Sequence, residues 1–283
     1  MQIGLHIPQD GMKYTEIKET VLKAEETGLN FISFMDHLHA SPKPDQQDFL
    51  ECWTLLSALA SDTSRVRLTP LVLNINNRNP ALLAKMASSL DQISDGRLVL
   101  GIGAGGTNRA SRQKQNGFEY EFDAYGVDFP MKPSIRIERL CEGLEIIKLM
   151  WTTEKASYSG RHYTLREAIC MPKPVQKPYP PILIGSTGGA LMMKQVAKHA
   201  DIWDYMRATT VKDLAKGRFI LKKACSKTGR DPEDIKVSMR VTGTVDECIE
   251  KMNRLENEGL DQAVLVAPKG KETLFLQELA SKL

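Results

Sequence analysis

Two histidines and an aspartate stand together near the start of the chain, in a pattern that suits acid–base or metal chemistry. Asp36, His37 and His39 follow an apolar run at 31–35. Histidine exchanges protons near neutral pH, and a neighbouring carboxylate can fix its orientation. A zinc site would need further ligands, and only His6 lies at another strand end. We predict an acid–base role for His37 oriented by Asp36; ordinary polar packing and a metal site are the alternatives.

A second candidate is a glycine-rich turn that joins a predicted strand to a predicted helix. Its sequence is Gly185-Ser186-Thr187-Gly188-Gly189, before a helical pattern over 189–199. Backbone N–H groups at a helix N-terminus, flanked by glycines, bind phosphate. The lysine of a nucleoside-triphosphate loop is missing. We predict a phosphate cradle, with a simple capped turn as the alternative.

A third glycine cluster, GIGAGG at 101–106, matches the dinucleotide pattern GxGxxG. In a dinucleotide fold this motif opens the first strand–helix unit and runs straight into a helix. Here it follows the fourth predicted strand, and the next residues form helices poorly. A nicotinamide-binding fold is therefore disfavoured, and a tight turn explains some of these glycines.

The elements that must position these residues alternate along the chain. Apolar runs rich in strand formers predict strands, and apolar residues at three- and four-residue spacing predict helices. The predicted strands are 2–7, 31–35, 66–75, 97–103, 181–186, 201–206, 236–241 and 262–267. The predicted helices are 17–28, 49–61, 80–93, 134–151, 189–199, 211–227, 244–258 and 270–281.

Eight strands and eight helices in alternation favour parallel strands with crossover helices. We predict one α/β domain over 1–283, a (β/α)8 TIM barrel, with an open doubly wound sheet as the competitor. Insertions follow strand four, at 104–132, and precede strand five, at 152–181. The latter includes a possible hairpin at 158–165, and Pro70 suggests a bulge or an edge in strand three. In such a barrel, the active site lies at the carboxyl ends of the strands.

Composition limits the classes of function. The chain is 42% hydrophobic and 26% charged, as in ordinary globular proteins, and its net charge of +3 is too small to indicate nucleic-acid binding. The five cysteines form no CxxC pair, which argues against disulfides and cysteine–zinc sites. We see no signal peptide and no apolar run of about 20 residues, so we expect a cytoplasmic protein without a membrane partner.

Several segments together resemble one family. They are SFMDHLH at 33–39, ECWTLLSALASDTSRVRLTPLV at 51–72, NRNPALLAKMASSLDQISDGRLVLGIGAG at 77–105 and PKPVQKPYPPILIGSTGG at 172–189. This combination is similar to the luciferase-like flavin/F420-dependent oxidoreductase family, and the resemblance covers residues 1 to about 205. It implies a (β/α)8 barrel that binds either the deazaflavin F420 or FMN.

The resemblance also assigns roles. Asp36 and His37 match the family's Asp-His pair, in which the histidine exchanges a proton with the substrate. A bulge in strand three, often with a cis non-proline peptide bond, would support the cofactor ring. The cofactor contacts that it implies are His6, Leu71, Val72, Asn74, Ala104, Gly105, Gly106, Gly185, Ser186, Thr187, Gly188 and Gly189. Gly106 stands where many F420-dependent sugar-phosphate dehydrogenases carry Glu, which argues against a sugar-phosphate substrate.

These observations predict an F420-dependent oxidoreductase that transfers a hydride to or from a small organic substrate. Arg109, Arg112 and Lys114 could meet an acidic cofactor tail or form a solvated loop. An FMN-dependent monooxygenase that uses O2 is the first alternative. A metal-dependent hydrolase built on His6, His37 and His39 and a non-catalytic flavin-binding protein are the others. The family also leads us to expect a homodimer.

Overall fold

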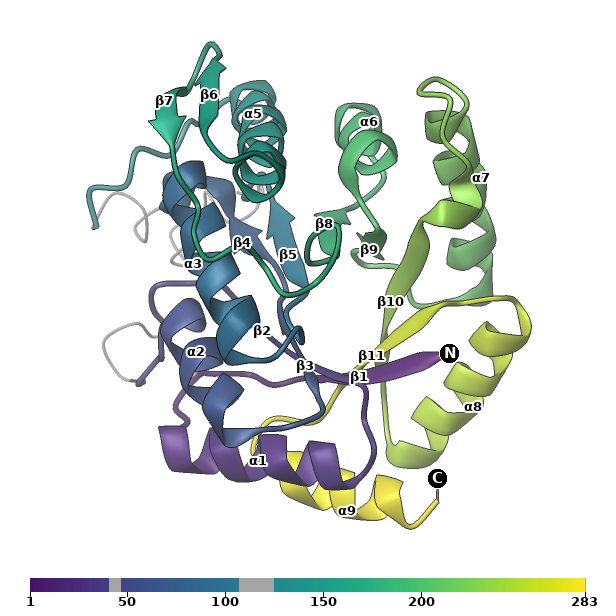
Figure 1. Cartoon of the computed structure of the whole chain (residues 1–283). Coiled ribbons are helices and arrows are strands. Elements are labelled where there is room, and N and C mark those ends of the chain that lie inside the picture. The colour runs from purple at the N-terminus through teal and green to yellow at the C-terminus, as the bar shows by residue number, and fades with distance from the viewer. Residues whose placement is uncertain (41–46, 107–124, 283) are drawn as a thin grey trace.

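The computed structural model describes residues 1–40, 47–106 and 125–282. One sheet of parallel strands occupies its centre (Figure 1). Along the sheet the strand order is β3-β2-β1-β11-β10-β9-β8-β5-β4. The bounds are β1 (Gln2–His6), β2 (Phe31–Phe34), β3 (Arg67–Pro70), β4 (Leu73–Asn74), β5 (Leu100–Gly103), β8 (Ile182–Ser186), β9 (Ile202–Tyr205), β10 (Lys236–Thr242) and β11 (Gln262–Val266).

The sheet closes into a barrel at its two terminal strands, β3 and β4, which follow one another in the chain. β3 and β4 are separated only by Leu71 and Val72. Leu68 of β3 also forms a parallel bridge to Leu98, just ahead of β5. The N–H of Val99 donates to the carbonyl of Leu68 at 3.0 Å. The fold is therefore the α/β barrel that the alternating pattern predicts.

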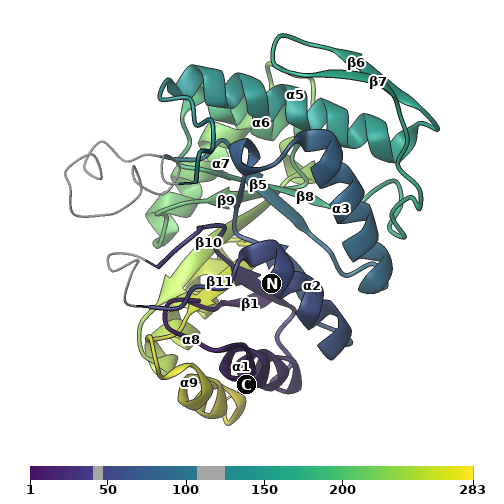
Figure 2. The same cartoon turned by 90° about the vertical axis from the view of Figure 1, so that its left-hand side faces the viewer.

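Helices surround the strands (Figures 1 and 2). Those of the described residues are α1 (Tyr14–Glu26), α2 (Cys52–Asp62), α3 (Pro80–Ile93), α5 (Pro133–Thr152), α6 (Ala190–His199), α7 (Val211–Cys225), α8 (Val245–Asn257) and α9 (Glu272–Ala280), with short 3-10 turns at η1 (Ile75–Asn77) and η2 (Pro232–Asp234). None of them is long and apolar enough to span a membrane.

Local sequence accounts for where the helices begin. Thr244 and Glu247 form a capping box at the start of α8, in which each side chain satisfies a backbone N–H of the other. At α3, Asn79 accepts hydrogen bonds from two backbone N–H groups, and Pro80 occupies the first turn. Each helix then turns its apolar stripe toward the sheet, as Leu83 does in α3.

Strand three is the main departure from the predicted elements. The pattern predicts one strand over 66–75, but the structure has two, β3 and β4, with a cis peptide bond between Leu71 and Val72. Pro70, which suggested a bulge or an edge, is the last residue of β3. Proline has no N–H for a ladder, so the regular pairing ends there.

The two predicted insertions differ in what the structure describes. Within 152–181, β6 (Ala156–Ser159) and β7 (Thr164–Ala168) form an antiparallel hairpin, as predicted, which lies beside α5 and apart from the barrel (Figure 1). Most of the other insertion, including Arg109, Arg112 and Lys114, lies outside the described residues. That the whole chain forms one domain stays a prediction.

The interior of the barrel is filled at its amino end by an apolar cluster. The cluster consists of Phe31, Leu71, Val99, Leu183, Ile202 and Val264. A Cβ atom on Gly4 would lie 2.4 Å from the ring of Phe31, and one on Gly101 would lie 1.9 Å from the carbonyl oxygen of Pro70. Gly4 leaves room for the ring of Phe31, and Gly101 leaves room for the backbone at Pro70, where strand three is interrupted. The cavity described below opens at the opposite, carboxyl end.

A buried carboxylate fastens α1 to the start of β3. Glu25 accepts hydrogen bonds from the backbone N–H groups of Arg65 and Val66, both at 2.9 Å, and from the hydroxyl of Ser64, also at 2.9 Å. Burial alone would raise its pKa, but these donors favour the charged form and lower the pKa from 4.5 to about 2. The interaction therefore stabilises the fold fully above pH 4.5 and is lost as the pH falls toward 2.

We expect Glu25→Gln to lower the free energy of unfolding at pH 7 by about 1 to 3 kcal/mol, since four donors, including the N–H of Ser64, lose a charged acceptor. Its stability should also fall less between pH 4.5 and 2 than that of the unmodified protein. Urea unfolding at several pH values measures both effects. Glu26→Gln, at the exposed neighbour, is the control and should change stability by less than about 1 kcal/mol. Equal acid sensitivity of Glu25→Gln and the unmodified protein would contradict this account.

Candidate active site

A cavity of about 740 Å³ opens at the carboxyl ends of the strands. Every predicted site residue except Gly188 lines it, so the strand ends bring together residues that are up to 183 positions apart, such as His6 and Gly189. Carboxyl strand ends meet at one face of a parallel barrel, and that is the face where such folds carry their sites. The roles of the individual residues stay predictions.

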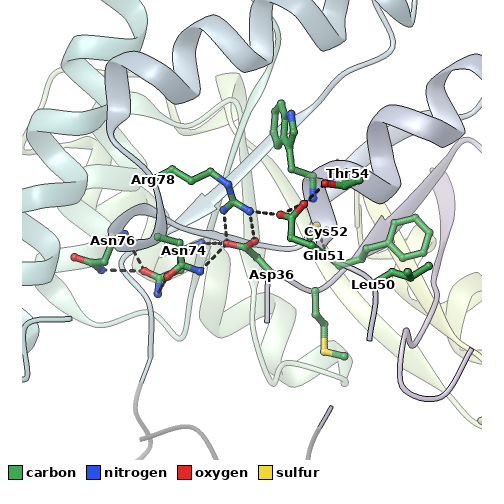
Figure 3. Close-up of polar contacts among 12 residues, drawn as sticks. Asp36, Leu50, Glu51, Cys52, Thr54, Asn74, Asn76 and Arg78 are labelled. Carbon is green, nitrogen blue, oxygen red and sulfur yellow. Dashed lines mark hydrogen bonds and ion pairs between the residues drawn. The ribbon is translucent and has the colours of Figure 1, made fainter. Parts of the chain in front are cut away.

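Asp36 is held in a buried network rather than presented to the cavity as an open carboxylate (Figure 3). Its side chain is 1% exposed and receives two hydrogen bonds from the guanidinium of Arg78, at 2.8 and 2.9 Å. The backbone N–H of Asn74 donates to it at 2.9 Å and the amide of Asn77 at 3.3 Å. Asp36 thus ties the end of β2 to the end of β4.

Arg78 also pairs with Glu51, the residue that caps α2 (Figure 3). Burial disfavours the charge of Arg78, but the two carboxylates outweigh it and raise the pKa of the guanidinium. Burial would likewise raise the pKa of Glu51, yet hydrogen bonds from Thr54 and Trp53 and the charge of Arg78 lower it. Glu51 and Arg78 therefore each favour the charged form, and the arginine links both acids.

A chain of amides continues from this network to the strand-four loop. The side-chain oxygen of Asn74 accepts from the backbone N–H of Asn76 at 3.1 Å and from its amide at 2.9 Å. That amide also donates to the carbonyl of Ala104 at 3.1 Å. A Cβ atom on Gly105 would lie 2.6 Å from the oxygen of Asn74, so only glycine fits there in this arrangement. The loop beside the cavity is therefore placed by the same residues that hold Asp36.

Val72 forms an apolar surface at the break in strand three. Cβ atoms on Gly103 and Gly185 would lie 3.0 and 3.2 Å from its side chain. Val72 is thus seated between two strands whose glycines leave room for it, and it lines the cavity. The cis peptide bond expected here from the family resemblance is present between Leu71 and Val72. A flat aromatic ring could rest against such a surface.

The turn 185–189 leaves the N-terminus of α6 open to an anion. Gly189 is the N-cap residue of α6, and no side chain caps the helix there. No atom lies within 4 Å of where a Cβ on Gly189 would be, so the backbone can be approached closely. Gly188 has a φ of 92° and donates its N–H to the hydroxyl of Ser186 at 3.1 Å. The uncapped N–H groups suit a phosphate.

Charged and polar groups also lie where β1 and β10 meet the cavity. Nδ1 of His6, in β1, lies 3.0 Å from the hydroxyl of Ser33. Burial, together with the charge of Arg240, lowers the pKa of His6 to about 3, so this ring is neutral at working pH. Arg240, in β10, lines the cavity and pairs with Asp204, whose side chain is 1% exposed.

The three histidines of the metal alternative do not gather among the described residues. His37 is half-buried and lines the cavity, but His39 does not line it, and Nδ1 of His39 lies 3.0 Å from the carbonyl of Ala40. In the described part of the chain, the one group of three metal-type donors within 4.8 Å of one another lies elsewhere, in α5 and α6. The metal-dependent hydrolase hypothesis therefore gains no support from the geometry.

Sequence reasoning did not assign roles to Glu51, Arg78 or Arg240. Glu51 and Arg78 stand inside segments that resemble the family, but their partner Asp36 lies in a different segment. No spacing rule links these positions, since the ion pairs form across strand ends. Arg240 was visible as a charged residue at the end of a predicted strand, which is the signal that could have marked it.

Comparison with known proteins identifies relatives over most of the chain. A model of the luciferase-like monooxygenase family matches residues 1–263. An uncharacterized protein of Mycobacterium tuberculosis is 33% identical over 165 residues, which is 58% of this chain and 51% of that protein. A phthiodiolone/phenolphthiodiolone dimycocerosates ketoreductase of the same species is 31% identical over 188 residues, or 65% and 45% of the two chains. The chain thus spans about half the length of these curated relatives.

Solved structures share the fold. The coenzyme F420-dependent tetrahydromethanopterin reductase of Methanopyrus kandleri superposes with a TM-score of 0.81 at 17% identity and covers 100% of this chain and 98% of that one. An F420-dependent secondary alcohol dehydrogenase gives a TM-score of 0.80 at 17% identity, over 98% and 97% of the chains. A monooxygenase from Streptomyces bottropensis gives 0.76 at 19% identity, over 100% and 98%.

We expect Arg78→Gln to destabilise the protein by about 3 to 5 kcal/mol, because Asp36 would stay buried without its counter-ion. Asp36→Asn/Arg78→Gln should recover part of this loss, since the buried charge is removed as well. Urea unfolding measures both variants. Arg161→Gln, in an exposed ion pair with Glu138, is the control and should cost less than about 1 kcal/mol. An Arg78→Gln variant as stable as the control would refute this role.

Proposed function

Because the chain belongs to the luciferase-like monooxygenase family, we propose that it is an oxidoreductase that uses the deazaflavin F420. It would transfer a hydride between F420 and a small organic substrate. This proposal rests on one observation, which is that three features line the same cavity. These are the open helix N-terminus at 185–189, the apolar surface of Val72 and the histidine at position 37.

The residues of the cavity fit such a cofactor. A phosphate fits the uncapped N-terminus of α6, where side chains are small and Gly189 has open space. A flat ring fits against the apolar side chain of Val72, which Gly103 and Gly185 leave room for and which lines the cavity. The family and its solved relatives support a deazaflavin or a flavin, and the two F420-dependent structural neighbours are the observation that leads us to propose F420 rather than FMN.

The protein would supply orientation and proton transfer. When bound, the deazaflavin supplies the carbon that accepts or donates the hydride. A ring nitrogen of His37 holds or releases the proton that accompanies the hydride at the substrate oxygen. Asp36 positions this histidine through the backbone, because its own carboxylate is engaged by Arg78 and Asn74. Asp36 is thus proposed as a positioning residue.

Titration with F420 and FMN side by side tests the choice of cofactor. We expect F420 to bind more tightly than FMN, followed by absorbance and fluorescence. Gly188→Ala should weaken F420 binding at least about tenfold, because a side chain at its φ of 92° strains the turn of the cradle. The control is Gly270→Ala, which also has a positive φ, of 74°, but lies in open space. Tighter binding of FMN would instead favour the oxygen-dependent monooxygenase.

We expect His37→Ala to reduce the rate of hydride transfer by about 10²- to 10⁴-fold while leaving the dissociation constant of F420 within about twofold. The assay is single-turnover oxidation of reduced F420 against a panel of small ketones. His39→Ala is the matched control in the same turn, since His39 does not line the cavity. Full activity of His37→Ala would rule out its role in proton exchange.

A further inference from the structure

An ion pair lies inside the barrel where apolar side chains are usual. Arg240 pairs in register with Val264, which belongs to the apolar cluster of the barrel interior. Asp204 lies two positions after Ile202, a member of the same cluster, and side chains alternate along a strand. Both charged side chains therefore point into the barrel. Because burial of an ion pair costs solvation energy, this pair requires an explanation other than stability.

The pairing of Arg240 with Asp204 is loose. Nη1 of Arg240 lies 3.2 and 3.4 Å from the two carboxylate oxygens, whereas a strong charge-assisted bond is about 2.7 to 2.9 Å. The hydrogen bonds to Asp204 use Nη1 alone. Nε and Nη2 carry three more N–H groups, and the side chain is 24% exposed and lines the cavity. Among the residues that the structure describes, one edge of the guanidinium fork is thus left for a ligand.

The surroundings of Arg240 favour an anion. His6, the titratable neighbour on β1, has a lowered pKa and is neutral. It therefore places no charge of either sign beside an anion bound at Arg240. Asp36, a buried acid that lines the cavity, is already engaged by Arg78. Toward β2 and β4, the acid at the cavity, Asp36, is held by Arg78. Toward β10, Arg240 itself lines the cavity.

We propose that Arg240, positioned by Asp204, binds a carboxylate group of the substrate beside the carbon that exchanges the hydride. This inference rests on the proposed oxidoreductase function and adds the substrate class, a small carboxylate-bearing ketone or alcohol. A planar guanidinium matches a carboxylate with two parallel hydrogen bonds. His6 beside it offers a neutral ring that tolerates the anion.

The cofactor phosphate has a different place in the cavity. The uncapped helix N-terminus follows β8, and exposed Arg207, just after β9, lines the cavity. Arg240 instead lies within β10, beside the buried Asp204. A phosphate at the rim and a carboxylate on the floor therefore use separate groups.

Pyruvate and pyruvamide test the proposal, since they share a methyl ketone and differ in the carboxylate charge. Each is titrated calorimetrically into protein saturated with oxidised F420 and into protein without cofactor. We expect pyruvate to bind at least about tenfold more tightly than pyruvamide. Arg240→Gln should abolish this preference and leave the dissociation constant of F420 within about twofold.

Two further variants keep the test interpretable. Asp204→Asn/Arg240→Gln removes both charges, so it should fold even if Arg240→Gln alone does not, and it should also lose the preference for pyruvate. Arg166→Gln, at an exposed position in β7 that does not line the cavity, should retain it. Equal binding of pyruvate and pyruvamide to the unmodified protein would overturn the proposal.

The remaining outcomes separate this inference from the proposed function. If Arg240→Gln weakens F420 as much as pyruvate, the guanidinium serves the cofactor and the substrate assignment is wrong. If the unmodified protein binds no F420, the proposed function fails, while the comparison in cofactor-free protein still decides whether Arg240 selects carboxylates.

Discussion

The buried ion pair between Asp36 and Arg78 is the interaction on which the architecture of the cavity depends. It joins the end of β2 to the end of β4 at the place where strand three is interrupted. The same arginine reaches the cap of α2 through Glu51. Since a buried charge without its partner is strongly destabilising, none of these parts can change alone. The acid therefore acts by fixing positions, while the neighbouring His37 faces the cavity.

The barrel separates two needs that compete for the same space. Its amino end is packed with apolar side chains and supplies stability. Its carboxyl end accepts the costs of a cavity, of uncapped N–H groups at the start of α6 and of a half-buried arginine, Arg240. Glycines make this possible, because a Cβ atom at position 103 or 185 would collide with Val72 and one at position 105 with Asn74. Under the proposed function, the cofactor takes the β4, β5 and β8 side, and the substrate takes the side near β10 and β1.

Much of this fold could be predicted because its elements are regular. Alternating apolar runs and helical patterns identified the barrel, and the hairpin at 158–165 was visible within the irregular stretch 152–181. The predicted strand over 66–75 was wrong in detail. Most of its residues favour strands and Pro70 suggested a bulge or an edge, but local pattern contains no information on the seating of Val72 between β5 and β8.

The sequence by itself determined the order of strands and helices, and with it the strand ends where a site must lie. It also marked Asp36, His37 and the turn 185–189, because residue type and local spacing are enough for those. Only the tertiary structure decided that Asp36 is engaged by Arg78 and that Arg240 faces the cavity beside Asp204. The reason is physical: these charges meet across neighbouring strands of a closed barrel, and contacts between distant segments leave no periodic signal in the chain.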